Sequence, residues 1–263
     1  MKISCSTAAF IDPKSSVEEK LRASIEALNT IVNYGYDGIE LFIPKVFNEE
    51  QNDILFKEAE KIKGKILSMH APKNTLHRPA KEIFPSLSRL IKRAGELETK
   101  IIVLHPPFQK DFSSLLRKVF FIFDKLINYA QKNNVILTIE NVPYLLDPPI
   151  FYEELTKRYS EGIGITIDIE YLHSTPYSLE KYPTELLTNF LKNIHIRDYD
   201  GHSFDDEGRR RYLQLGKGNI DFKKIFKKLS ELNYKGPVTV ETVFNNEPDD
   251  LIYCQDFILK NLS

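Results

Sequence analysis

The chain has 263 residues, of which 42% are hydrophobic, and its 36 basic and 37 acidic side chains nearly cancel. This length suits a single domain over residues 1–263, and the balanced charge argues against a protein that binds nucleic acid through overall basicity. The sequence has no apolar run that suits a signal peptide or a membrane span, and Cys5 and Cys254 lie in no metal-type spacing, so we expect a cytoplasmic protein without disulfides.

Short runs that favour β-strands alternate with helical stretches along the whole chain. Eight such runs are found, at residues 2–7, 38–43, 65–72, 100–107, 136–142, 163–171, 192–198 and 237–243. Each gap between them has room for one helix. In two gaps the helical period is clear, because apolar residues recur every three or four positions over residues 17–32 and again over residues 83–94.

Eight strand–helix units in about 250 residues match an α/β fold of the (β/α)8 TIM barrel type. The alternative is an open, doubly wound sheet. Such a sheet usually carries a Gly-rich phosphate turn after its first strand, and the stretch CSTAAF at residues 5–10 has none. We therefore predict a TIM barrel.

Strand parity predicts which side chains point into this barrel, because alternate residues of a strand face opposite sides. In the run ILTIEN, Leu137 and Ile139 would face the helices, which places Thr138 and Glu140 inside. The same parity in five other runs puts a metal-type ligand at an inward position near the strand end. The six residues are His70, His105, Glu140, Asp168, His195 and Glu241. We expect them to converge at the C-terminal mouth of the barrel, where the sites of such enzymes lie.

Three imidazoles and three carboxylates suit a transition-metal ion better than calcium. A buried carboxylate such as Glu140 is costly unless a cation or a hydrogen-bond network accompanies it. We therefore predict that a divalent metal ion, namely zinc, manganese, cobalt or magnesium, lies against Glu140. Glu40, which ends the second run, is expected to support the site or its rim rather than to bind the ion.

The motifs SMHAP, VLHPP, TIENVP, TIDIEYLH, IHIRDYDG, LGKGNIDF and TVET follow one another over nearly the whole chain. Together they resemble the xylose isomerase-like TIM barrel superfamily, which joins divalent-metal sugar isomerases and epimerases to DNA-repair phosphodiesterases of the endonuclease IV type. The resemblance implies one metal site made by Glu140, Asp168, His195 and Glu241. It also implies that His70 and His105, with Glu140 bridging, correspond to an additional zinc site of the endonuclease branch; whether this second ion is present stays open.

The sequence departs from the endonuclease branch at its third zinc. That branch has a His three residues after the sixth-strand Asp and an Asp-x-His before the LGxG turn, where this chain has Tyr171, Arg210 and Tyr212. His173 follows two residues later and can replace one ligand only. Arg210 would bring a permanent positive charge toward the ion, so we expect the three-metal phosphodiesterase site to be incomplete.

A metal ion flanked by two glutamates suits proton transfer beside a carbonyl. The resemblance implies that Glu140 and Glu241 act as acid and base from either side of a bound sugar. For Arg197, which has inward parity, a grip on the substrate and a structural salt bridge are both open. Further candidate substrate contacts are Tyr171, His173, Arg210 and Tyr212.

We therefore predict a metal-dependent sugar or sugar-phosphate isomerase or epimerase that works through an enediolate. Two alternatives are an endonuclease IV-like phosphodiesterase with a reduced metal set, and a non-catalytic barrel that binds a ligand and keeps a structural metal. The expected partner is a small sugar or sugar phosphate rather than nucleic acid or a membrane. The sequence leaves the sugar, the native metal and the oligomeric state open.

Overall fold

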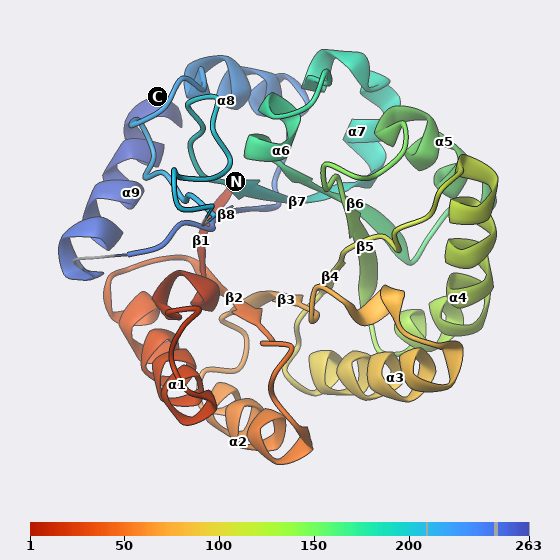
Figure 1. The fold of residues 1–263 in the computed structure, drawn as a ribbon, viewed down its shortest axis with the longest axis horizontal. Coiled ribbons are helices and arrows are strands. Elements are labelled where there is room, and N and C mark those ends of the chain that lie inside the picture. Colours follow the sequence, from red (N-terminus) through yellow and green to blue (C-terminus); the bar gives the residue numbers. More distant parts are fainter. Residues whose placement is uncertain (209, 245–246, 263) are drawn as a thin grey trace.

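The computed structural model describes residues 1–208, 210–244 and 247–262. Eight parallel strands close into one barrel in the order β1 to β8, and β8 pairs with β1 (Figure 1). The strands are β1 (Lys2–Ser6), β2 (Gly38–Phe42), β3 (Ile66–His70), β4 (Ile101–Leu104), β5 (Ile136–Glu140), β6 (Ile163–Asp168), β7 (Leu191–Ile196) and β8 (Pro237–Val240). The closed order confirms the predicted TIM barrel and excludes an open sheet.

Helices surround the strands as an outer ring (Figure 1). They are α1 (Val17–Asn33), α2 (Glu49–Glu60), α3 (Ala80–Glu96), α4 (Phe112–Lys132), α5 (Pro148–Arg158), α6 (Ile169–His173), α7 (Thr184–Phe190), α8 (Phe222–Glu231) and α9 (Glu247–Leu262). Short 3-10 turns lie at η1 (Thr7–Phe10), η2 (Thr75–His77) and η3 (Leu179–Lys181). The two periodic stretches in the sequence form α1 and α3. Across the described parts of the chain, no helix has the length and apolar character needed to cross a membrane.

Local sequence fixes where the first helices begin. Before α1, the Ser16 hydroxyl accepts a hydrogen bond from the Glu19 backbone N–H, while the Glu19 carboxylate accepts one from the Ser16 backbone N–H. Asn48 and Gln51 form the same reciprocal pair before α2. Such capping boxes satisfy backbone N–H groups that have no partner inside the helix.

Hydrogen bonds inside the barrel confirm the predicted strand parity. The hydroxyls of Thr138 and Thr166 lie 2.7 Å apart, and the Thr239 hydroxyl donates to the Asn193 side-chain oxygen at 3.2 Å. All four side chains are buried, and each lies two residues before a predicted ligand along the chain. The next inward position of each strand is therefore at the C-terminal mouth.

All eight expected strand runs extend past the observed strand ends. The excess is largest, at three residues, where the runs predicted to end at residues 107, 171 and 243 end at Leu104, Asp168 and Val240. In the first case Pro106 and Pro107 follow, and a proline has no N–H to donate to the neighbouring strand. His105 and Glu241 therefore lie one residue beyond their strands.

Candidate metal centre

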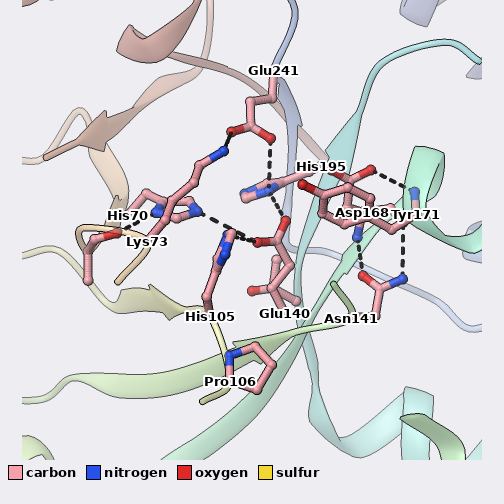
Figure 2. Close-up of polar contacts among 12 residues, drawn as sticks. His70, Lys73, His105, Pro106, Glu140, Asn141, Asp168, Tyr171, His195 and Glu241 are labelled. Carbon is pink, nitrogen blue, oxygen red and sulfur yellow. Dashed lines mark hydrogen bonds and ion pairs between the residues drawn. The ribbon is translucent and has the colours of Figure 1, made fainter. Parts of the chain in front are cut away.

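The six predicted ligands meet in two overlapping clusters at the barrel mouth (Figure 2). One cluster contains His70, His105 and Glu140; the other contains Glu140, Asp168, His195 and Glu241. Within each cluster, one ligand atom from every residue lies within 4.8 Å of the others. All six residues are buried, so the convergence predicted from strand parity is present.

In the first cluster, three buried nitrogen and oxygen atoms lie close together without a hydrogen bond of ordinary geometry. His70 Nδ1 lies 2.7 Å from the Ala71 carbonyl oxygen and therefore carries the hydrogen, which leaves a lone pair on Nε2. Glu140 Oε2 lies 3.6 Å from this Nε2 and 2.7 Å from His105 Nε2. Among the described residues none of these three buried atoms has a hydrogen-bond partner. Burial lowers the pKa of His105 to about 4, so its imidazole is neutral at neutral pH. A divalent cation satisfies such a set of acceptors.

In the second cluster, the orientation of His195 is set by the carboxylate behind it. His195 Nε2 lies 2.9 Å from Glu40 Oε2, so this nitrogen donates its hydrogen to Glu40. The other nitrogen, Nδ1, lies 2.9 Å from Glu140 Oε1 and 3.6 Å from Glu241 Oε2. A carboxylate that fixes the tautomer of a histidine in this way is typical of metal-binding imidazoles.

Glu40 is wholly buried beneath the two clusters. Its Oε2 also accepts hydrogen bonds from the Ser68 hydroxyl at 2.8 Å and the Asn193 amide at 3.1 Å. Burial opposes its charge, but the neighbouring His195 outweighs burial and lowers the pKa of Glu40. Glu40 belongs to neither cluster, and its role in supporting the site rather than binding the ion stays a prediction.

Arg197 is wholly buried among carboxylates. This arrangement is the structural salt bridge that was one of the two roles considered for it. Its Nη2 lies 2.7 Å from Asp168 Oδ2 and its Nη1 lies 3.0 Å from Glu241 Oε2. Its Nε donates to Glu170, a buried residue that also accepts a hydrogen bond from Arg210. One guanidinium thus offsets the charge of two ligands. Burial raises the pKa of Asp168 to about 7 although Arg197 opposes this effect.

Cations and phenol rings lie where the endonuclease branch has its third zinc. The Arg197 guanidinium is 4.9 Å from the ring centre of Tyr171 and 5.5 Å from that of Tyr212. Arg210 lies 5.9 Å and 5.7 Å from the same two rings. His173 Nδ1 lies 2.9 Å from a backbone carbonyl oxygen of its own helix, and this histidine joins neither cluster. In the described chain, no further group of candidate ligands is found here.

Three residues of the site were not among the predicted ligands or contacts. Asn141 exchanges two hydrogen bonds with the backbone of Asp168, at 3.1 Å and 2.6 Å, and so ties the ends of β5 and β6 together. Lys73 Nζ lies 3.9 Å from Glu241 Oε1 (Figure 2). Glu170 accepts hydrogen bonds from Arg197 and Arg210. Asn141 directly follows Glu140 and Glu170 follows Asp168 by two residues, so proximity to a predicted ligand was the available signal.

Neighbouring positive charges keep the Glu241 carboxylate ionised. Burial opposes its charge, but Lys73, Arg197 and His195 together outweigh burial and lower the pKa of Glu241 to about 2. The carboxylate borders a cavity of about 450 Å³ that lies among the loops after β1, β2, β3 and β8 and is also lined by Tyr212. A small molecule in this cavity would therefore meet an ionised carboxylate.

Known proteins share this architecture at low sequence identity. An uncharacterized protein of Methanocaldococcus jannaschii is 26% identical over 161 residues, which are 57% of this chain and 53% of that protein, so the match spans about half of the relative. The structure of a D-allulose 3-epimerase from Methylomonas sp. is similar with a TM-score of 0.73 and 14% identity, covering 100% of this chain and 98% of that chain. The structure of the IolI protein with a zinc atom gives 0.73 and 17%, again covering 100% and 98%.

The family comparison covers more of the chain than the match to the Methanocaldococcus relative. The sequence pattern of the family described as xylose isomerase-like TIM barrel matches residues 28–256. This stretch contains seven of the eight strands and all six clustered ligands. The chain therefore belongs to the xylose isomerase-like TIM barrel family.

Proposed function

We propose that this protein is a divalent-metal-dependent sugar isomerase or epimerase that moves a proton at the carbon beside a carbonyl group. The observation that carries this proposal is the pair Glu140 and Glu241, two buried carboxylates that approach the same His195 nitrogen from 2.9 Å and 3.6 Å. Both have a pKa below the ordinary value, although burial opposes this. Glu241 borders the cavity, and an ionised carboxylate in that position is suited to take a proton from carbon.

The residues present fit a divalent metal ion. The supporting observations are the unpartnered polar atoms of the first cluster and the position of His195 Nδ1, which lies 2.9 Å from Glu140 Oε1 and 3.6 Å from Glu241 Oε2. One ion would be held by Glu140, Asp168, His195 and Glu241, and a second by His70, His105 and Glu140. When bound, the ion withdraws electron density from the sugar carbonyl and so makes the neighbouring C–H more acidic.

The proton transfer itself is assigned to the glutamates. Glu241, kept ionised by Lys73 and Arg197, accepts the proton from the sugar carbon, and the electron pair of the broken C–H bond forms an enediolate. We assign Glu140, the other glutamate of the same cluster, to the opposite face of the sugar. Return of the proton to the same carbon on the other face is epimerisation, and its return to the neighbouring carbon is isomerisation.

The positions of the third zinc favour this activity over phosphodiester cleavage. Tyr171, Arg210 and Tyr212 occupy those positions, and none of these side chains is a good ligand for a divalent cation at neutral pH. The same groups can donate hydrogen bonds to sugar hydroxyls. The similar structure named a D-allulose 3-epimerase supports the same choice.

Proton exchange with solvent tests the proposal. Metal-loaded protein incubated with ketopentoses and ketohexoses in D₂O should introduce deuterium at the carbon next to the carbonyl, measured by NMR or mass spectrometry. Glu241→Gln should reduce the exchange rate by ~10²–10⁴-fold, the usual contribution of a general base. Glu161→Gln, at an exposed glutamate, is the matched control and should exchange normally. Incision of an abasic-site DNA duplex without exchange on any ketose would instead support the nuclease alternative.

A further inference from the structure

The cavity beside Glu241 carries more positive charge than proton transfer requires. Lys20, Lys45 and Lys73 all line it, and Glu241 is the single acidic residue among the described residues of its wall. The three lysines come from separate segments, namely the first turns of α1 and the loops after β2 and β3. The fold thus brings three ammonium groups to one small space.

Two of these three ammonium groups are not paired with a carboxylate of the described residues. Lys73 is the lysine near Glu241, with a separation of 3.9 Å. Lys20 donates a hydrogen bond to the Ser15 carbonyl oxygen, and Lys45 is exposed. Within the described chain, neither Lys20 nor Lys45 forms an ion pair with a carboxylate. Two cations of the cavity wall therefore remain available to a ligand.

A buried hydroxyl in the same wall also lacks a partner. Thr242, the residue after Glu241, is 2% exposed and lines the cavity. Its hydroxyl oxygen has no hydrogen-bond partner among the described residues. Buried side-chain hydroxyls are normally paired, so an oxygen-rich ligand in the cavity would complete this group.

We propose that the cavity binds an anionic group of the substrate, a phosphate or a carboxylate, so that the substrate is a sugar phosphate or a sugar acid rather than a neutral sugar. The placement of the reacting carbon at Glu241 rests on the proposed function, whereas the anion site does not. Lysine ammonium groups bind phosphate as point charges. The cavity of about 450 Å³ has the size of a small-molecule site.

Binding of inorganic phosphate to the metal-loaded protein, measured by titration calorimetry, tests the anion site. Replacement of two lysines of the wall in Lys20→Glu with Lys45→Glu should weaken phosphate binding at least tenfold, and Thr242→Val should weaken it severalfold. The control is Lys223→Glu with Lys227→Glu, which makes the same change in charge on the exposed face of α8 and should leave binding unchanged. Absence of binding to the unaltered protein, or equal binding by both double variants, would refute the anion site.

Competition identifies the anionic group. A ketose, its terminal phosphate and the sugar acid of the same chain length are each used to displace inorganic phosphate. An anionic competitor should displace phosphate at a concentration at least tenfold lower than the neutral ketose. Whichever of the sugar phosphate and the sugar acid displaces phosphate at the lower concentration identifies the anionic group that the cavity binds. Equal displacement by the neutral ketose contradicts the proposal.

The two proposals fail in different ways. Phosphate binding that depends on Lys20 and Lys45, without deuterium exchange on any ketose, ketose phosphate or sugar acid, would refute the proton-transfer function and support the anion site. Deuterium exchange on neutral ketoses by a protein that binds no phosphate would support the proton-transfer function and refute the anion site.

Discussion

Glu140 connects the two halves of the candidate site with its two oxygens. Oε1 lies 2.9 Å from His195 Nδ1, whereas Oε2 lies 2.7 Å from His105 Nε2. Burial opposes the charge on Glu140, but these two histidines outweigh burial and hold its pKa well below the usual range. Any change in the charge of this one carboxylate therefore acts on both clusters at once.

The histidines of the first cluster should hold a metal ion of their own. We expect two metal ions per chain, because His70 Nε2, His105 Nε2 and Glu140 Oε2 are buried close together and have no hydrogen-bond partner among the described residues. The double change His70→Ala with His105→Ala should remove one ion, and Asp168→Ala should deplete the other, since loss of even a supporting residue costs ~10–100-fold in affinity. Elemental analysis of the purified proteins measures this.

His173→Ala is the control for the metal prediction. This histidine bonds to a backbone carbonyl oxygen of its own helix and belongs to neither cluster, so its loss should leave the metal content unchanged. A single ion per chain that survives the loss of both His70 and His105 would assign those histidines to substrate contact instead.

Arg197 should be necessary for stability as well as for the site. Arg197→Met leaves the buried carboxylates Asp168, Glu170 and Glu241 without their shared cation, and breaking a buried ion pair typically costs ~3–5 kcal/mol. The free energy of unfolding from urea titration measures the loss. Arg158→Met breaks an ion pair with Asp124 in which both side chains are more than two-fifths exposed, so it should cost at most ~1 kcal/mol. Similar losses in both variants would contradict the role of Arg197.

At the scale of single elements, the capping box of α1 offers a stability test. Ser16→Ala removes the hydroxyl that accepts from the Glu19 backbone N–H, and losses of this kind cost ~1 kcal/mol. Thr30→Ala in the same helix is the control. The Thr30 hydroxyl bonds only to a carbonyl one turn earlier, and alanine is the better helix former, so the free energy of unfolding should stay within ~0.5 kcal/mol. Equal losses would mean that the cap does not stabilise α1.

The ends of the strands explain why local sequence was informative about the site. β5 and β6 end on Glu140 and Asp168, and the side chains before them alternate between barrel and helices as the strand period requires. The two-residue period of a strand therefore predicted both where the strands lie and which ligand side chains point into the barrel. Strand length was least well predicted at β4, β6 and β8, where the expected runs continued three residues past the observed ends.

At the scale of the whole molecule, the closed barrel turns six separate strand ends into one site, and this step was predictable from the eight repeated units. The partners of individual charged groups could not be predicted from sequence. Arg197 and Glu170 are close in space because β7 lies beside β6, yet the choice of guanidinium partners depends on distances of a few ångströms. Lys73 lies in a loop, where side chains follow no regular period, so its approach to Glu241 could not be predicted from sequence.

The seam between β1 and β8 sets the order in which a newly synthesised chain can finish folding. β1 is made before the other strands of the barrel, whereas its partner Pro237–Val240 is made after them, and the Tyr36 hydroxyl donates to the Leu251 carbonyl oxygen in α9. Before β8 is made, the partly formed sheet has two open edges with unpaired N–H and C=O groups, which can pair with other chains. Protection by a chaperone is therefore most valuable until Pro237–Val240 pairs with β1.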